Sequence, residues 1–593
     1  MEESDVSLEH YQYTDLPANF RVLELLPGKR GEHISILLQT VDWNNYPDFN
    51  AISYAWGDIH KKRPIICHSK WLYVSENLYA ALEHLRYESE SRYLWADAVC
   101  TNQKNIPERG TQVAQMKRIY EASKSTIVWI GEDEKQSKAQ DAKTAINKIS
   151  DTICDKLGVS VPELSKIGDV YNDLVFKNRH KLPLPETLNL GTEVSLDSLI
   201  WLFSKPYFTR VWVVQEIYAQ AARMVHCGEE EISWDRLQLV ACYFIADTAW
   251  SKQYGFTSTN CWYVASMSAV GFSHPDNWPQ MLYLASNFAS TDPRDQIFSL
   301  RGLMKLGLGA DLLMPDYSKS VLEIYRNSVE AALTDFQSTD VLNYTPGTRM
   351  AVSWVPDWNH AMLFRNPFRF GKPLPWKPAG ATKAVWKVDR GANFLYLTGK
   401  IIDSIKYTES YKENYFDNIV SETDRMFLSR NWTRILNAIE KSQSHVPFTK
   451  EVLTATATSF TFGLNEKTDP GDEHIFLVNF IAYLKTILTE KTFNKYISTE
   501  LAKDAENGEA HTFGKPVWDF KYPESTFFIT ETGLVGCSTE INHAGDVVFV
   551  PLGSVYPLII RPIAGYYCLK GFAYVYGYMY GDPPSETQVV EIH

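Results

Sequence analysis

The stretch from residue 50 to residue 131 alternates strand-like and helix-like segments, and this order restricts the fold more than any other feature of the chain. Apolar runs at 51–54, 93–96 and 126–130 predict three short strands. Two helices are predicted between them, with apolar positions on one face: Leu78, Leu82 and Leu85 after a Ser75 cap, and Val113, Met116 and Tyr120 after Pro107. Strands joined through helices form crossover connections, so the sequence predicts a parallel sheet flanked by helices.

The remaining sequence suggests how the 593 residues are divided. We predict an α/β domain over 1–225 with a polar, helical insertion at about 132–197, then a helical region over 226–350. The third part, 351–593, is a mixed α+β region. Its end is rich in β-branched and aromatic residues separated by glycines, which predicts an antiparallel meander or a small barrel.

Charge and cysteine content argue against several classes of function, although a local basic patch stays possible. Lys and Arg total 58 and Asp and Glu total 71, giving a net charge of −13 that argues against nucleic-acid binding and against adhesion to an anionic membrane. The 8 cysteines have no metal-site spacing and are expected to be reduced and mostly buried. The N-terminal stretch lacks an apolar signal core, and Ile475–Leu488, interrupted by Asn479 and Lys485, is too short to span a membrane. We therefore expect a cytoplasmic protein.

Polar residues follow two of the predicted strands. Asp58 comes after the first strand and Asp97 after the second, and Asn102 lies in the small polar run that leads into the next helix. In open parallel sheets, ligands bind outside the carboxyl ends of the strands, so these side chains are candidates to bind a polar ligand. Both aspartates could equally cap turns or helices, a common role for Asp.

A second candidate is the segment 210–216, in which Trp212 and Glu216 are four residues apart and share one helix face. A carboxylate among large apolar side chains is costly to bury unless it is paired. Glu216 is therefore a candidate for electrostatic or acid–base catalysis, and the alternative is a salt bridge to Arg210 or another arginine.

The segment 291–296 carries alternating charges. Arg294 between Asp292 and Asp295 is most simply an arginine–carboxylate clamp that holds a loop between domains, and phosphate binding by Arg294 is the alternative. P-loop, GxSxG, HExxH and Rossmann glycine motifs are absent, and the histidines lack metal-ligand spacing.

Taken together, several segments resemble the fungal heterokaryon-incompatibility (HET) domain. They are FNAISYAWGD (49–58), NLYAALEHLR (77–86), the long block LWADAVCTNQKNIPERGTQVAQMKRIYEASKSTIVWIGE (94–132) and RVWVVQEI (210–217). Ala96 and Thr101 depart conservatively from the family pattern, and downstream segments such as TDPRDQIFSLRGL resemble the usual body of long family members. The resemblance implies a self/non-self recognition protein that triggers cell death in filamentous fungi.

HET domains are more remotely similar to TIR domains, many of which have a flavodoxin-like sheet and some of which cleave NAD. The TIR catalytic glutamate lies in a W-C-x-x-E pattern, which this chain matches at Trp212 to Glu216 with Val213 in place of the cysteine. The resemblance thus implies that Glu216 is catalytic. It also implies that Ser53, Tyr54, Trp56, Gly57 and Asp58, which match the TIR first strand and its loop, border the nucleotide pocket. Asp97 and Asn102 at the strand ends, and Trp212 as an aromatic wall beside Glu216, are the further candidates to bind the nucleotide.

The implied reaction is hydrolysis of NAD at the nicotinamide–ribose bond, with NAD as substrate and with no cofactor or metal. Positive charge develops on the ribose, as in glycoside hydrolysis, and a preorganised carboxylate stabilises it. The implied partners are an incompatibility protein and further copies of the chain in a homo-oligomer formed on activation. Two alternatives remain, a non-enzymatic module that acts by assembly and a nucleotide sensor that binds without turnover.

Overall fold

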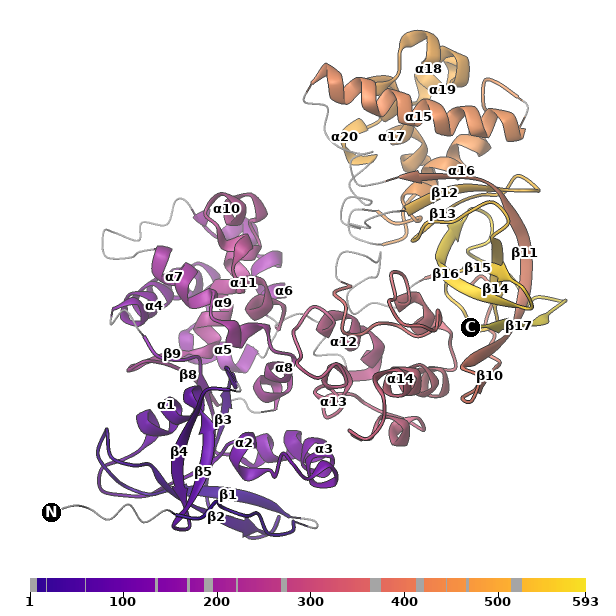
Figure 1. The fold of residues 1–593 in the computed structure, drawn as a ribbon. Coiled ribbons are helices and arrows are strands. Elements are labelled where there is room, and N and C mark those ends of the chain that lie inside the picture. Colours follow the sequence, from indigo (N-terminus) through magenta and orange to yellow (C-terminus); the bar gives the residue numbers. More distant parts are fainter. Residues whose placement is uncertain are drawn as a thin grey trace. The chain divides into compact units, whose positions relative to one another are not determined.

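The fold is described from a computed structural model of the chain (Figure 1). The structure describes residues 8–16, 19–58, 60–133, 137–167, 171–185, 196–219, 222–267, 275–362, 375–411, 421–443, 445–465, 469–513 and 525–593. The chain forms two compact units, the first made of Met1–Lys305 and Leu313–Ser320 and the second of Leu306–Leu312 and Val321–His593. The predicted boundaries at 225 and 350 stay predictions.

The first unit contains a nine-stranded mixed sheet in the order β5-β4-β2-β1-β6-β3-β7-β8-β9. Its strands are β1 (Phe20–Leu25), β2 (Ser35–Val41), β3 (Asn50–Tyr54), β4 (Lys62–Cys67), β5 (Lys70–Ser75), β6 (Arg92–Trp95), β7 (Thr126–Trp129), β8 (Arg223–Cys227) and β9 (Glu230–Ser233). The three predicted strands are β3, β6 and β7, and β3 pairs in parallel with both others. With β8, which is parallel to β7, they form the parallel centre of the sheet.

Antiparallel strands extend this centre on both sides. On one side β1 pairs antiparallel with β6 and with β2, and on the other side β9 pairs antiparallel with β8. The α/β prediction is therefore confirmed, in a sheet that is wider and mixed. The added strands β1, β2, β4, β5, β8 and β9 were not among the predicted ones.

The two predicted helices are present and begin as expected. In α1 (Glu76–Leu85) the Ser75 side chain caps the first turn and Leu78, Leu82 and Leu85 are buried. In α3 (Ile106–Ala122), which follows the short α2 (Asp97–Cys100), Asn105 supplies the cap and Pro107 lies in the first turn. Figure 1 shows α1 on one side of the strands and α2 and α3 on the other, so helices cover both faces of the sheet.

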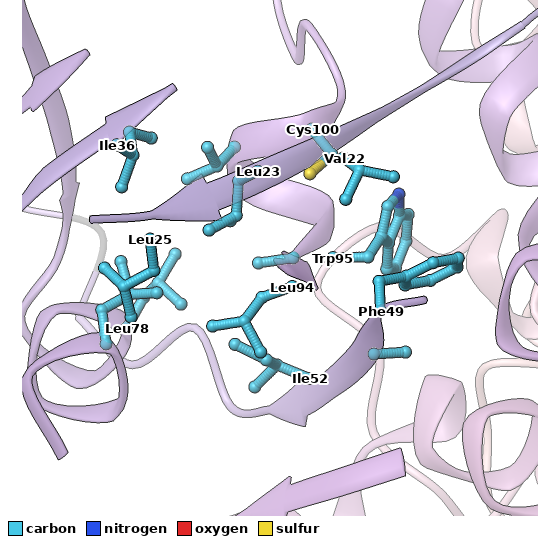
Figure 2. Close-up of a cluster of buried hydrophobic side chains, with 14 of the residues drawn as sticks. Val22, Leu23, Leu25, Ile36, Phe49, Ile52, Leu78, Leu94, Trp95 and Cys100 are labelled. Carbon is cyan, nitrogen blue, oxygen red and sulfur yellow. The ribbon is translucent and has the colours of Figure 1, made fainter. Parts of the chain in front are cut away.

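Buried side chains from both faces make up the core of this sheet. Figure 2 shows Val22, Leu23 and Leu25 of β1 with Leu94 and Trp95 of β6 in one cluster. Trp56 and Trp212 are partly buried and pack against the same cluster. Because Trp212 is 156 positions from Trp56 in the sequence, only the fold brings the two to one core.

Helices form the rest of the first unit. They are α4 (Lys138–Leu157), α5 (Val161–Ile167), α6 (Tyr171–Lys177), α7 (Leu196–Phe203), α8 (Val211–Tyr218), α9 (Trp234–Ile245), α10 (Thr248–Gln253), α11 (Cys261–Ser266), α12 (Trp278–Ala285) and α13 (Asp295–Phe298). The predicted insertion accordingly contains α4 to α6, and its residues 134–136, 168–170 and 186–195 lie outside the described ranges. Across the described residues, no helix has the length and apolar character needed to cross a bilayer.

The second unit is built around an antiparallel barrel. Its strands are β10 (Trp386–Asp389), β11 (Phe394–Tyr411), β12 (Ser525–Thr530), β13 (Val535–Ser538), β14 (Val547–Pro551), β15 (Leu558–Ile563), β16 (Tyr566–Val575) and β17 (Gln588–Ile592). The order β11-β12-β13-β16-β15-β14 closes because β14 also pairs with β11. Of the two predicted arrangements, meander or small barrel, the barrel is the one observed.

The long strand β11 makes this closure. Its register shifts between Ile401 and Asp403 against β14 and between Ile405 and Tyr407 against β12, and such bulges bend a strand. The helices of this unit are α14 (Val321–Phe336), α15 (Glu422–Gln443), α16 (Lys450–Phe460), α17 (Glu473–Ile487), α18 (Glu490–Tyr496), α19 (Thr499–Asp504) and α20 (Ala510–Phe513). Helices α15 to α20 lie in the connection between β11 and β12.

Candidate functional site

The candidate site lies where strand β3 ends, next to the start of α2 and beside α8. Ser53 and Tyr54 are the last residues of β3, and Asp97 is the first of α2, directly after β6. Because β3 and β6 are parallel neighbours, their carboxyl ends share one edge of the sheet. Helix α8 carries Glu216 to the same edge, since the Ser53 hydroxyl donates a hydrogen bond to the Glu216 carboxylate.

Three side chains form a continuous hydrogen-bonded chain at this edge. The Ser53 Oγ lies 2.5 Å from the Tyr207 hydroxyl and also contacts Glu216. A hydroxyl has one proton, so when Ser53 donates to an ionised Glu216 the Tyr207 hydroxyl donates to Ser53. A protonated Glu216 could donate to Ser53 instead, with the direction of both bonds reversed. The chain can therefore accommodate either protonation state of the glutamate.

The environment of Glu216 favours the protonated form. Its residue is only 5% exposed, and burial raises the pKa of the carboxyl to about 7. The charge of Arg210 and the Ser53 hydrogen bond act in the opposite direction, and the charge of Asp97 adds to the rise. A carboxyl with a pKa near neutrality can gain or lose a proton under cellular conditions, which suits acid–base chemistry.

Asp97 forms the second carboxylate of the site. Its Oδ2 accepts a hydrogen bond of 2.9 Å from the Trp56 indole, and its Oδ1 accepts one of 2.8 Å from the Ala98 backbone N–H. Burial raises the pKa of Asp97, while Arg210, Tyr54 and Trp56 oppose the rise. The Trp56 side chain is thereby held by Asp97, the first residue of α2.

Arg210 provides the positive charge for both carboxylates. Its guanidinium donates to the backbone carbonyl of Tyr54, at the end of β3. From that position it lowers the pKa of Glu216 and of Asp97. The sequence left a salt bridge between Arg210 and Glu216 open as an alternative. Within the described residues these two side chains form no direct ion pair, and the arginine acts on the glutamate through its field.

The other predicted ligand residues lie at the margin of this cluster. Gly57 has a φ of +71°, which suits the turn after β3. Asp58 is exposed and accepts a 2.9 Å hydrogen bond from the His60 N–H, and Asn102 accepts a 3.2 Å bond from the Lys104 N–H. These are the turn-capping roles given above as the alternative for Asp58. As ligand-binding residues, Gly57, Asp58 and Asn102 stay predictions.

Sequence reasoning missed Tyr207 and the role of Arg210. Tyr207 lies in a short 3-10 helix, η3 (Pro206–Thr209), immediately before α8, and is 1% exposed. Its only sequence signal is its closeness to the segment 210–216, which does not reveal its contact with Ser53, 154 positions away. Tyr120 of α3 is also near. Its hydroxyl donates to the Ile52 carbonyl over 3.2 Å, and burial raises its pKa, with the charge of Glu216 adding to the rise.

Trp212, one turn before Glu216, faces a second acidic residue. Burial raises the pKa of Asp295, whereas hydrogen bonding with Tyr317 and with the Trp212 indole lowers it. The neighbouring Arg294 donates to both carboxylate oxygens of Asp292, at 2.9 and 2.8 Å, and to the carbonyls of Tyr317 and Lys319. The predicted pairing of Arg294 with a neighbouring carboxylate is thus present, and the place of its loop between domains stays a prediction.

In chemical terms, the site combines a buried carboxyl of near-neutral pKa, a second carboxylate, one arginine and an aromatic side chain. Such a set can stabilise a developing positive charge and accept a proton. Across the described residues, no group of three or more His, Cys, Asp and Glu side chains is arranged to bind a metal ion.

Comparison with known proteins shows similarity to a family model and to a curated fungal protein. Residues 49–216 match the family model described as heterokaryon incompatibility protein (HET), a range that contains every residue of the site from Ser53 to Glu216. Over 97% of its length, the chain is 22% identical to heterokaryon incompatibility protein 6, OR allele, of Neurospora crassa, of which the alignment covers 96%. No solved structure matches the chain.

Proposed function

We propose that this protein, which carries a HET domain over residues 49–216, is an effector of heterokaryon incompatibility that hydrolyses NAD+ to nicotinamide and ADP-ribose. The family match and the incompatibility relative support the general role. The observation that carries the enzymatic part is the buried Glu216 carboxyl, with a pKa raised to about 7, beside Asp97 and Trp56 at the carboxyl ends of parallel strands. TIR-like use of Glu216 is part of the proposal.

The proposed reaction breaks the bond between ribose C1′ and the nicotinamide nitrogen. The electron pair of this bond leaves with the nitrogen, so the nicotinamide becomes neutral and positive charge develops on the ribose. An ionised Glu216 next to the ribose stabilises that charge. Water then adds to C1′, and its proton passes to Glu216, whose pKa of about 7 allows it to accept the proton and later release it to solvent.

Asp97 and Trp56 have supporting roles in the proposal. The Trp56 ring can stack on nicotinamide or adenine, and its indole N–H is already fixed on Asp97 at 2.9 Å. Asp97 can accept hydrogen bonds from ribose hydroxyls through oxygens that now bind Trp56 and Ala98. Glu216, at 5% exposure, requires a shift of α8 or of the Trp56 loop before a substrate reaches it.

The test is nicotinamide release from NAD+ by purified full-length protein, followed by chromatography. Glu216→Gln keeps the shape of the side chain and removes its charge, and we expect release to fall by at least about 100-fold, the scale of one electrostatic catalytic group. The matched control is Glu88→Gln, an exposed glutamate after α1, which should leave release unchanged. Unchanged release in Glu216→Gln would remove this residue from the mechanism.

A non-enzymatic role is the second candidate, and the burial of Glu216 is the observation that favours it. The carboxylate is covered and hydrogen-bonded to Ser53, as expected of a purely structural residue. In that case the protein acts by binding an incompatibility partner or further copies of itself. Absence of nicotinamide release at every protein concentration, including those that produce oligomers, would favour this candidate.

We also propose that the protein acts in the cytoplasm, where NAD+ is abundant, and that activation involves a homo-oligomer. Binding of NAD+ without cleavage would make the protein a nucleotide sensor. Isothermal titration of NAD+ into the Glu216→Gln variant separates binding from turnover.

A further inference from the structure

The segment just before α8 is tied to a distant stretch of the first unit. The Val211 N–H donates to the Ala289 carbonyl over 3.0 Å, and the Ala289 N–H donates to the Thr209 carbonyl over 2.6 Å. These two backbone bonds fix the point at which α8 begins. Ala289 is thereby joined by its backbone to the start of the helix that carries Glu216.

Side chains continue this connection along α8. Asp295 of α13 is 7% exposed, accepts a 2.6 Å hydrogen bond from the Tyr317 hydroxyl and interacts with the Trp212 indole. Gly302 packs so closely on the next part of α8 that a Cβ atom there would lie 2.5 Å from Oε1 of Gln215. Contacts thus reach the residues at 212 and 215, both within one turn of Glu216.

Tyr317 is held firmly in its place. The Arg109 guanidinium lies 3.6 Å from the centre of the Tyr317 ring, and that of Arg294 lies 5.3 Å from it. Arg294 also donates to the Tyr317 carbonyl over 2.7 Å. Two residues earlier, the Pro315 carbonyl packs against Gly110 of α3, where a Cβ atom would lie only 2.7 Å from it.

The connectivity around Tyr317 is unusual. Leu313–Ser320 belongs to the first compact unit, whereas the residues on both sides of it, Leu306–Leu312 and Val321 onward, belong to the second. This eight-residue segment is the part of the first unit that is covalently joined to the second unit at both ends. A conformational change in the second unit can therefore pull on Tyr317 directly through the backbone.

The arrangement of α8 leaves the site closed. Ser53 is fully buried and Glu216 is 5% exposed, so the carboxylate cannot meet a substrate while α8 stays in place. In this position Trp212 interacts with Asp295, which also binds the Tyr317 hydroxyl, and Gln215 packs on Gly302.

We propose that Leu313–Ser320 is an inhibitory latch, which holds α8 closed over Glu216 through the series Tyr317, Asp295 and Trp212 and opens the site when it is released. The inference concerns the regulation of the proposed NAD-cleaving site and rests on that proposed function for its effect on activity. The closing of α8 by the latch is a structural statement that can be measured independently of catalysis.

The test uses the full-length protein with Tyr317→Phe, which removes the hydroxyl bonded to Asp295 and keeps the ring that stacks on Arg109. The control is Tyr87→Phe, a 45% exposed tyrosine of the same unit. If Tyr317→Phe fails to fold, Asp295→Asn is used instead, because it weakens the same hydrogen bond between the Tyr317 hydroxyl and residue 295. Hydrogen exchange of the amides of Val211–Tyr218 and nicotinamide release are measured on each protein.

We expect α8 amides to exchange about tenfold faster in Tyr317→Phe than in the wild type, the factor expected for one lost hydrogen bond to a carboxylate, and release of nicotinamide to increase. Trp212→Phe, which removes the indole N–H, should add little further exchange in the Tyr317→Phe background, because both changes break the same series. If each variant only destabilised the protein in general, the increases in amide exchange from Tyr317→Phe and Trp212→Phe would instead add fully in the double variant.

Unchanged exchange of α8 in both Tyr317→Phe and Asp295→Asn overturns the latch. Faster exchange with lower nicotinamide release also overturns it, because the contact would then support activity rather than inhibit it. If no protein releases nicotinamide, the proposed NAD-cleaving function fails, and the exchange of α8 still decides whether the latch closes this helix.

Discussion

The Ser53 hydroxyl donates to the Glu216 carboxylate across 163 positions of sequence, and this bond joins the last turn of α8 to strand β3. Ser53 is fully buried and Glu216 nearly so. The Ser53 hydroxyl, which also bonds Tyr207, gives the Glu216 carboxylate one hydrogen bond but does not replace the water that an exposed carboxylate would bind. The carboxyl group therefore stays close to the balance between its charged and neutral forms.

The first prediction concerns the pH dependence of stability. The pKa of Glu216 is raised from 4.5 to about 7 in the folded protein, so the folded state binds the proton more tightly than the unfolded state. The stabilisation from protonation is complete below pH 4.5 and is lost as pH rises to about 7. Glu216→Gln cannot titrate and should not show this loss. The free energy of unfolding of Glu216→Gln minus that of the wild type should therefore be on the order of 3 kcal/mol larger at pH 8 than at pH 4.

Urea unfolding of both proteins at the two pH values measures this difference. Carboxyls that do not interact with Glu216 titrate in both proteins and cancel in the comparison, whereas Asp97, whose charge adds to the rise of the Glu216 pKa, contributes to the difference. An equal stability difference at both pH values would mean that Glu216 has an ordinary pKa.

The second prediction concerns Arg210. Replacing it with Gln removes the positive charge that lowers the pKa of Glu216 and of Asp97, and removes a hydrogen bond to the Tyr54 carbonyl. We expect the free energy of unfolding to fall by about 1.5–3 kcal/mol at pH 8. The decrease should be smaller at pH 5, where the carboxyls are more protonated. Unfolding midpoints at both pH values test this, with the exposed Arg30→Gln as control. A loss independent of pH would indicate that the arginine contributes packing alone.

The third prediction concerns Gly110 in α3. Alanine in a helix interior is ordinarily about 1 kcal/mol more favourable than glycine. Here the added Cβ would lie 2.7 Å from the Pro315 carbonyl, a backbone atom that can move only with its segment. We expect Gly110→Ala to destabilise the protein by about 1–2 kcal/mol in net terms, whereas the exposed neighbour Thr111→Ala should have little effect. Thermal unfolding distinguishes them, and a stabilised Gly110→Ala would contradict the close packing.

The fourth prediction compares two ion pairs of similar length and opposite exposure. Arg21 and Glu108 lie 2.6 Å apart with side chains 1% and 3% exposed, whereas Arg30 and Glu229 lie 2.8 Å apart with side chains 69% and 68% exposed. Glu108→Gln leaves a buried arginine without a counter-charge and should cost about 3–5 kcal/mol. Glu229→Gln should cost less than about 1 kcal/mol. Equal effects on the unfolding midpoint would mean that burial does not decide the strength of these pairs.

Local sequence patterns predicted the elements whose signals are local. The cap at Ser75 and the apolar positions of α1 are short-range features, and both are present as predicted. The parallel order of β3, β6 and β7 followed from the helices between them. The clamp at Arg294 followed from charges only two residues apart, which can meet in a single turn.

The features that sequence could not predict depend on long-range packing. Strands β1 and β2 precede the region with clear alternation of strand and helix, and their place in the sheet is set by pairing with β6. The contact of Tyr207 with Ser53 needs both the sheet and the η3 turn to exist first. Asp97 was expected at a strand end, but its bond to Trp56 depends on how the loop after β3 turns at Gly57.

The path of the chain through residues 305–321 also limits how the protein can be dissected. A fragment that stops at Lys305 would lack Pro315 and Tyr317, and one extended to Ser320 would carry Leu306–Leu312 without the remainder of their own unit. No single cut yields two intact pieces. A recombinant fragment that ends at Lys305 would need the peptide Leu313–Ser320 added separately. Its nicotinamide release with and without that peptide would measure how strongly the segment restrains α8 in the uncut chain.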